Sequence, residues 1–182
     1  MPTAVALRQS LSNTCVAHSS AASAGIRIAP ADDKGLGGFC TAAIEKGAVV
    51  GHYLGEILSS DEVGARYWAT HKKRPADRRW ARSRRQRGQG LTGDYLFDVG
   101  DDLFIDGEDA DVANWCRFIN HAPPDSLACN LETHHTKAKL LARDGEKADP
   151  SLWFVAIRDI AAGEELAYDY GDVYWEPAEA DL

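Results

Sequence analysis

A nine-residue segment near the end of the chain limits the available folds more than any other feature. It runs from Gly163 to Gly171 and reads GEELAYDYG. Tyr168 and Tyr170 stand at alternate positions, so an extended strand would place both phenol rings on one face. A buried pair of phenols can position an amine and accept a proton from it. The simpler interpretation of Tyr-x-Tyr alone is an edge strand with surface tyrosines.

A second segment precedes the tyrosines and reads Arg117-Phe118-Ile119-Asn120-His121. Its Asn-His dipeptide carries donors and acceptors suited to a nucleotide-like cofactor. Both segments resemble the signatures of SET-domain protein lysine methyltransferases, and they follow that family's order. The combination makes the resemblance specific, because the two segments lie 42 residues apart from Asn120 to Ala162.

The remaining chain resembles the same family over roughly residues 25 to 176. The matching stretches are a glycine turn, a strand pair, a strand after a variable insert and a strand before the tyrosines: 34–39, 44–59, 95–98 and 153–160. The resemblance implies a mainly β fold with short helices. This is the SET fold, which consists of small curved sheets and a threaded, pseudoknot-like C-terminal segment.

The resemblance also implies S-adenosylmethionine as the cofactor and gives roles to individual positions. Tyr170 matches the catalytic phenol, Tyr168 matches the position that controls how many methyl groups fit, and Tyr53 matches a third tyrosine of the lysine channel. The positions that match cofactor contacts are Lys34, Gly35, Leu36, Gly37, Tyr95, Asn120, His121 and Tyr170. Arg117 is expected to be structural, and no metal is implied.

Such chemistry needs a neutral lysine amine, although free lysine has a pKa of about 10.4. Desolvation and a neighbouring sulfonium both lower that pKa, and the protein then supplies mainly alignment for an in-line displacement. Each assignment has a structural alternative. Tyr53 and Tyr95 could be core aromatics whose hydroxyls reach the surface, and His121 could be a buried histidine with satisfied hydrogen bonds.

Charge is concentrated in two stretches of opposite sign. Residues 66–87 hold ten of the twenty basic residues and one acid, and the remaining chain has ten basic and 27 acidic residues, a balance of −17. Residues 94–111 hold eight acids and no base. An acidic surface beside a cleft attracts a cationic polypeptide such as a histone tail. The basic run predicts nuclear import or nucleosomal DNA contact, or else a solvated, partly disordered loop.

Local signals predict one domain with three parts. We expect a flexible Ala- and Ser-rich segment at 1–24, the main domain at 25–176 with a basic insert at about 66–90, and a tail at 177–182. Residues 26–58 read as strands separated by glycine turns. Ser59 and Glu62 form a capping box that predicts a short helix running into the basic loop.

Other side chains set limits on the site. The four cysteines show no paired spacing, which indicates free thiols rather than a disulfide or zinc framework. His134 and His135 are expected in a solvated loop, and no apolar run of about 18 residues predicts a membrane span. Asn130 comes about four residues later than its family counterpart, so the loop before it must bulge. Trp175, a second copy of the chain or another partner is expected to close the site.

These features predict methylation of a protein lysine, on a histone tail in the nucleus, with monomethyl-lysine as the main product. One alternative is a catalytically weak chromatin-binding module that holds a lysine peptide without turnover. Another is an organellar methyltransferase acting on a non-histone protein, because the first 31 residues contain no acid.

Overall fold

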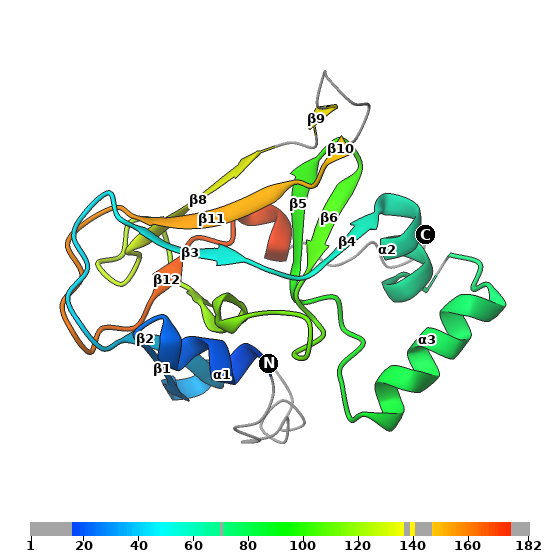
Figure 1. Ribbon diagram of the computed structural model, residues 1–182, viewed down its shortest axis with the longest axis horizontal. Helices are drawn as coiled ribbons and strands as arrows, with labels where there is room; N and C mark the ends of the chain where they lie inside the picture. Colours follow the sequence, from blue (N-terminus) through cyan, green and yellow to red (C-terminus); the bar gives the residue numbers. More distant parts are fainter. Residues whose placement is uncertain (1–15, 70, 137–138, 141–146, 176–182) are drawn as a thin grey trace.

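The computed structural model describes residues 16–69, 71–136, 139–140 and 147–175. Within these residues the strands form four small sheets, and the longer helices lie at the periphery (Figure 1). The predicted mainly β architecture with short helices is confirmed. Residues 1–15 of the expected flexible segment, and the expected tail at 177–182, lie outside the described residues.

The N-terminal part differs from the expected flexible segment because residues 16–23 are helical. Helix α1 (Val16–Ser23) packs against β1 (Ile26–Pro30) and against the 3-10 helix η3 (Trp115–Phe118). Ala17 and Ala21 are buried, since their small side chains allow the helix to approach closely. Strand β1 pairs antiparallel with β2 (Leu36–Cys40), and the 3-10 helix η2 (Asp32–Lys34) makes the turn between them.

The largest sheet has five strands in the order β3-β11-β8-β12-β7. Their bounds are Val49–Tyr53, Ser151–Ala156, Leu131–Thr136, Ala167–Tyr168 and Asn120–His121. In β11 the side chains alternate between partly exposed and buried, and Leu152, Phe154 and Ala156 enter the core. His134 and His135 lie on β8 rather than in the expected loop, although both are exposed to solvent as predicted.

The segment with the two tyrosines is threaded between elements that are distant in sequence. Strand β12 runs parallel to both β7 and β8, so it inserts between two strands that residues 122–130 connect. The backbone N–H groups at both ends of this connection, Ala122 and Asn130, donate to carbonyl groups of β12. On its other side the incoming chain bonds to β2 through the N–H of Leu166. This insertion is the threaded C-terminal arrangement that the resemblance implied.

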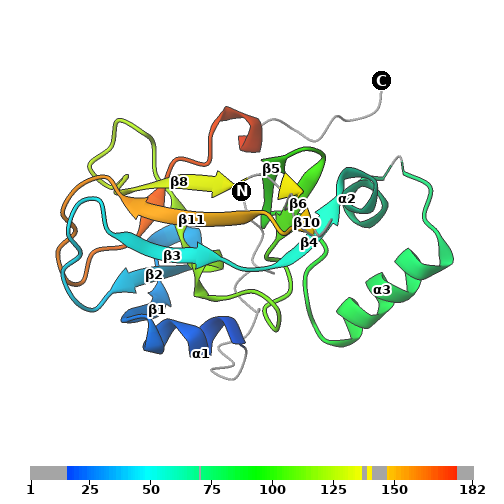
Figure 2. The same cartoon turned by 45° about the horizontal axis from the view of Figure 1, so that its top comes forward.

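A three-stranded antiparallel sheet extends the molecule toward its helical end (Figure 2). It has the order β4-β6-β5, with bounds Glu56–Ser59, Leu103–Asp106 and Leu96–Gly100. Helix α2 (Ser60–Tyr67) follows β4 directly, and the predicted capping box of Ser59 and Glu62 is confirmed at its start. A short pair, β9 (Lys139–Leu140) and β10 (Lys147–Ala148), completes the strands.

The basic insert is helical, and the predicted disordered loop is wrong over residues 75–86. Helix α3 (Pro75–Gln86) has proline at its first turn, and Asp77 accepts a hydrogen bond from the N–H of Arg74. The guanidinium groups of Arg66 and Arg84 both lie over Trp80, at 4.6 and 5.1 Å from its ring centre. The helix therefore has a real packing face, although that face is built from arginine and tryptophan rather than from aliphatic residues.

No helix in the described part of the chain is both long and apolar enough to cross a membrane.

Candidate active site

A cavity of about 510 Å³ lies where β5, β12 and the 3-10 helix η4 (Asp172–Trp175) meet. Aromatic side chains from distant parts of the sequence form much of its wall: Tyr53, Tyr95, Phe97, Phe104, Tyr168, Tyr170 and Tyr174. Three carboxylates, Asp94, Asp98 and Asp169, also line it. The cavity is therefore an aromatic chamber with an acidic edge.

The two tyrosines that define the sequence motif lie next to each other in this cavity. The ring centres of Tyr168 and Tyr170 are 4.7 Å apart, with 41° between the planes. Tyr170 donates its hydroxyl hydrogen to the carbonyl oxygen of Ile119 at 2.8 Å. Its backbone N–H donates to Nδ1 of His121 at 3.2 Å, which places the imidazole proton on Nε2. The sequence prediction that both phenols share one site is confirmed by this contact.

The Tyr168 side chain is buried among aromatic rings, and its hydroxyl is a polar group in these largely apolar surroundings. The ring stacks on Phe97 at 5.7 Å and meets Phe154 edge-on at 5.1 Å. The Tyr168 side chain also lines the cavity. A polar group at this position can hold water or a substrate nitrogen.

Tyr53 and Tyr95 also line the cavity. Tyr53 donates its hydroxyl hydrogen to the carbonyl oxygen of Tyr95 at 2.9 Å. Gly107 makes this possible, since an added Cβ at that position would collide with the Tyr53 hydroxyl. Arg117 lies 4.1 Å above the Tyr95 ring and donates to the carbonyl of Gly107 at 2.9 Å. Arg117 also lines the cavity, so the structural role expected for it stays a prediction.

Burial gives the cavity phenols a common electrostatic character. It raises the pKa of Tyr53, Tyr95, Tyr168, Tyr170 and Tyr174 above the ordinary tyrosine value. All five are therefore neutral phenols at physiological pH. They can donate and accept hydrogen bonds, but an ionised phenolate is not present to take a proton from an amine.

A polar cluster contains half of the residues assigned to the cofactor. Asn120 donates one amide hydrogen to the carbonyl oxygen of Leu36 at 3.2 Å and the other to Glu165 Oε1 at 2.7 Å. Lys34 lies 3.4 Å from Glu165 Oε2. Gly37 is required here, because a Cβ would come within 2.8 Å of the Glu165 carboxylate. The structure thus brings together Lys34, Leu36, Gly37 and Asn120 as predicted.

Gly35 provides the space beside this cluster. Its φ of +86° favours glycine, and a Cβ built there would meet no atom within 4 Å. His121 links the cluster to the aromatic cavity, since it follows Asn120 on β7 and its ring lies 5.4 Å from that of Tyr170. The two groups of predicted site residues are therefore adjacent.

Three residues of the site were not among the site residues predicted from the sequence. Glu165 belongs to the tyrosine motif, so the motif was the sequence signal from which its place in the site could have been predicted. Tyr174 packs edge-on against Tyr170 at 4.6 Å. Asn130 is buried, donates to the carbonyl of Glu165 at 2.8 Å and accepts the N–H of Ala167 at 3.0 Å. The shifted Asn130 therefore still anchors the motif strand, despite the longer loop before it. The side chain of Trp175, the expected lid, lies outside the described residues.

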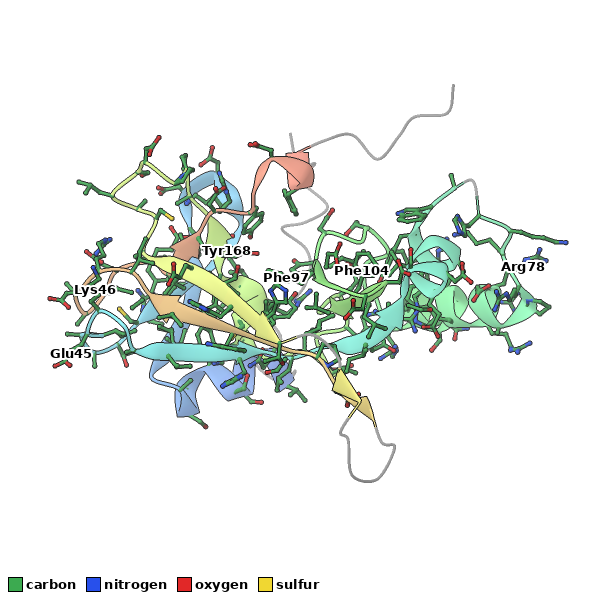
Figure 3. The ribbon with its side chains drawn as sticks, turned by 90° about the horizontal axis from the view of Figure 1, so that it is seen from above. Glu45, Lys46, Arg78, Phe97, Phe104 and Tyr168 are labelled. Carbon is green, nitrogen blue, oxygen red and sulfur yellow. The ribbon has the colours of Figure 1, made fainter. Side chains whose placement is uncertain are left out.

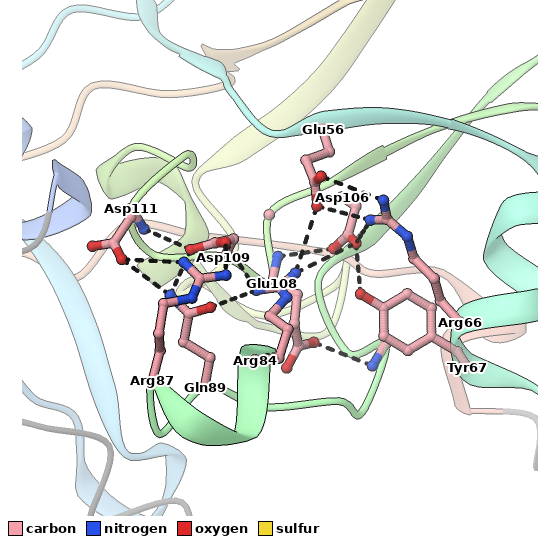
Figure 4. A network of polar contacts seen from close by, with 12 residues as sticks. Glu56, Arg66, Tyr67, Arg84, Arg87, Gln89, Asp106, Glu108, Asp109 and Asp111 are labelled. Atoms are coloured by element: carbon pink, nitrogen blue, oxygen red, sulfur yellow. Dashed lines mark hydrogen bonds and ion pairs between the residues drawn. The ribbon is translucent and has the colours of Figure 1, made fainter. Parts of the chain in front are cut away.

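The two oppositely charged stretches pair with each other (Figure 4). Arg84 is buried and lies 3.5 Å from Asp109, while Arg87 lies 3.0 Å from the same carboxylate. Arg66 pairs with Glu56 at 2.8 Å and approaches Asp106. Asp106, Glu108 and Asp109 are buried, so three of the eight acids in residues 94–111 do not contribute to an acidic surface. The expected acidic surface is therefore reduced to the exposed acids of that stretch.

Among the described residues, no group of three or more histidine, cysteine, aspartate or glutamate side chains is arranged to hold a metal ion.

Comparison with known families gives a match over residues 35–171, to the family described as "SET domain". The chain is 32% identical over 162 residues to the Neurospora crassa histone-lysine N-methyltransferase, H3 lysine-9 specific dim-5, covering 80% of this chain and 40% of that protein. It is 33% identical over 147 residues to the Drosophila melanogaster histone-lysine N-methyltransferase Su(var)3-9, covering 77% of this chain and 19% of that protein. The chain thus spans less than half of the length of these relatives.

Comparison with solved structures also gives matches. A humanized mutant of the Chaetomium thermophilum Polycomb Repressive Complex 2, bound to an inhibitor, matches with a TM-score of 0.51 and 27% identity, over 81% of this chain and 15% of that chain. The same values hold for an autoinhibited ctPRC2 bound to S-adenosylmethionine.

Proposed function

The chain belongs to the SET-domain family, and from this premise we propose that it transfers methyl groups from S-adenosylmethionine to a lysine side chain of a protein. The observation that carries the proposal is the adjacency of two sites. A chamber of neutral phenols around Tyr168 and Tyr170 lies beside a charged cluster built on Asn120 and Glu165. The first suits a lysine amine, and the second suits a zwitterionic cofactor.

The residues of the charged cluster fit the amino-acid end of S-adenosylmethionine. That end carries a carboxylate and an ammonium group. Lys34 offers a positive charge, and Glu165 offers a negative one 3.4 Å away. Both amide hydrogens of Asn120 are used, but among the described residues its amide oxygen accepts no hydrogen bond, so it can accept one from an ammonium group. The open space at Gly35 leaves room at this point.

When bound, S-adenosylmethionine supplies an electrophilic methyl group on a sulfonium. The contribution of the protein is to position and desolvate the amine. The aromatic walls exclude water, and a desolvated lysine loses its proton at a lower pH than a solvated one. Tyr170 gives its hydroxyl hydrogen to Ile119, which leaves the phenol oxygen as an acceptor for an amine hydrogen. Such contacts orient the nitrogen without any covalent enzyme intermediate.

We propose that the substrate is a histone tail and that the protein works in the nucleus. The relatives named above are histone-lysine methyltransferases, and others with about 30% identity are named for lysine 4 of histone H3. Asp94, Asp98 and Asp169 at the edge of the cavity favour a cationic polypeptide. This local acidity supports the proposal even though the wider acidic stretch is partly buried.

We propose monomethyl-lysine as the main product. The Tyr168 side chain lines the cavity among aromatic rings, so its hydroxyl can hold a water molecule there. That water occupies space that further methyl groups would need. Displacing it would leave buried polar groups unpaired, at a cost of about 1–3 kcal/mol.

The test is transfer of an isotope-labelled methyl group from S-adenosylmethionine to core histones and to a total lysate, with sites mapped by mass spectrometry. Tyr170→Phe should reduce labelling strongly while cofactor binding, measured by calorimetry, persists. Asn120→Ala should weaken cofactor binding at least tenfold, whereas Gln86→Ala, which changes an exposed amide on α3, should not. Cofactor binding without labelling of any protein would favour a binding module over an enzyme.

A further inference from the structure

A second groove, of about 580 Å³, lies between α2 and α3. Arg78, Arg82 and Arg85 stand at helical spacings of four and three residues, so they share one face of α3 and line this groove. Figure 3 labels Arg78 on α3, at the end of the molecule far from Tyr168. The groove and the aromatic cavity are separate sites.

The cations of this groove greatly outnumber its acids. Besides the three arginines, Arg66 and Lys73 line it, and Asp77 is its one acid among the described residues. Arg66 is already paired with Glu56, and Lys73 donates to the carbonyl oxygens at the end of α2, at 2.8 and 3.2 Å. These two side chains are therefore held in place by the protein itself.

The three arginines of α3 that line the groove have no such ionic partners among the described residues. In the part of the chain that the structure describes, Arg78 donates only to the carbonyl oxygen of Lys73, and neither Arg82 nor Arg85 has an ion pair. All three are exposed. Helix α3 thus carries two kinds of arginine. The buried Arg84 pairs with the acidic stretch, whereas the exposed Arg78, Arg82 and Arg85 form a cationic stripe that has no ion pair among the described residues.

We propose that this stripe, Arg78, Arg82 and Arg85, binds the sugar-phosphate backbone of DNA. Seven residues of α-helix span about 10.5 Å, so the stripe is elongated rather than point-like. A DNA strand presents one phosphate about every 3.4 Å of rise, which lets an elongated guanidinium stripe meet several charges at once. Guanidinium groups also bind phosphate oxygens bidentately. The groove suits a linear polyanion better than a single small anion.

The distribution of charge over the whole chain supports DNA rather than an acidic protein. The chain has a net charge of −8, and it carries acids at the edge of the aromatic cavity and cations on α3. Chromatin offers both complements, a cationic histone tail and an anionic duplex, on one particle. The inference rests in this respect on the proposed function, because it assigns the second surface of the same substrate.

The experiment measures binding of the full chain to a fluorescent DNA duplex by anisotropy over a range of salt concentrations, without cofactor. We expect the logarithm of affinity to fall linearly with the logarithm of salt concentration. The triple variant Arg78→Gln, Arg82→Gln, Arg85→Gln should flatten that slope by about 2.7, which is ~0.9 for each phosphate that the variant no longer neutralises. Arg82→Gln alone should flatten it by about 0.9, while Lys46→Gln, an exposed cation in a distant turn, should leave it unchanged.

Methylation of a free peptide separates this inference from the proposed function. The triple variant should methylate a free histone-tail peptide at the wild-type rate, but nucleosomes more slowly. Wild-type chain that does not bind DNA, or a triple variant with an unchanged slope, would refute the DNA surface even if peptide methylation is strong. Equal, α3-dependent binding of an acidic polyglutamate peptide would also overturn it, in favour of a protein partner. DNA binding without peptide methylation would leave the surface standing and contradict the enzyme.

Discussion

Arg84 is buried with its guanidinium 3.5 Å from the Asp109 carboxylate and 4.0 Å from that of Asp106, although 22 to 25 positions separate these residues in the chain. These two contacts of Arg84 hold α3 against the end of β6. From there, Gly107 follows directly and donates its N–H to the carbonyl oxygen of Tyr95, in the wall of the aromatic cavity. The insert and the cavity are thus joined by only a few residues.

Arg84→Gln should destabilise the protein. Burial raises the pKa of Asp106, which shows that this carboxylate is costly to keep charged, and Arg84 is one of the cations that oppose the shift. Removing one partner of a buried ion pair leaves uncompensated charge, and we expect a loss of about 3 kcal/mol, or roughly 6–12 °C in Tm. The measurement is thermal and denaturant unfolding.

Arg85→Gln provides the matched control, because Arg85 is the adjacent arginine and is exposed. Its effect on the free energy of unfolding should stay within about 0.5 kcal/mol. Equal stability of the two variants would show that the buried network does not hold α3.

The strands were predictable because their signals are local. Glycine turns separate the segments that became β1 to β4, and Ser59 with Glu62 fixes the start of α2 within four residues. Helix α3 was missed since its stability comes from a non-local source. Its sequence has almost no aliphatic side chains, and the buried partners of Arg84 lie beyond residue 105. Pro75 and Asp77 at the first turn were the local signals available.

The site residues also divide into those that local sequence signals predict and those that only distant contacts bring together. The tyrosine pair follows from a two-residue alternation that any extended segment imposes, and Tyr168 and Tyr170 do lie in contact. The contact of Asn120 with Glu165 joins positions 45 residues apart, and only the threading of β12 beside β7 brings them together. No spacing rule contains that information.

Gly107→Ala should impair the lysine chamber. A Cβ at this position would collide with the Tyr53 hydroxyl, so Tyr53 must move and lose its hydrogen bond to Tyr95. Overpacking of this kind costs about 1–3 kcal/mol. We expect lower stability together with a reduced rate of methyl transfer to peptide, while calorimetric affinity for S-adenosylmethionine stays within a factor of about three.

Gly38→Ala is the control for stability, since its added Cβ would make only ordinary contacts, the nearest at 3.5 Å from Ile26. If Gly107→Ala retains full peptide methylation, Tyr53 is a core aromatic and not part of the lysine channel.

The pH dependence of methyl transfer should show a rising limb without a tyrosine-dependent fall below about pH 10. The amine must be neutral, which favours high pH. Burial raises the pKa of Tyr53, Tyr168 and Tyr170, so these phenols keep their protons to higher pH than ordinary tyrosines. Their preference for the neutral form stabilises the fold below about pH 10 and is lost only as the pH rises through their raised values.

Initial rates on a short peptide, with cofactor binding measured at each pH, will check this. A descending limb centred near pH 8 that disappears in Tyr170→Phe would contradict it, because it would indicate a phenol with a lowered pKa.

Tyr168→Phe should change the product rather than abolish the reaction. The Tyr168 ring is fixed by Phe97, Phe154 and Tyr170, so phenylalanine can keep the same packing and lose only the hydroxyl. Without that hydroxyl the proposed water loses a hydrogen bond and is displaced more easily, which frees space for further methyl groups. We therefore expect the product to shift from monomethyl-lysine toward di- and trimethyl-lysine in timed reactions followed by mass spectrometry.

Tyr170→Phe should instead slow every methylation step, since it removes the acceptor that orients the amine. Abundant trimethyl-lysine from the unmodified protein would refute the role of Tyr168, because its hydroxyl would then not restrict the chamber.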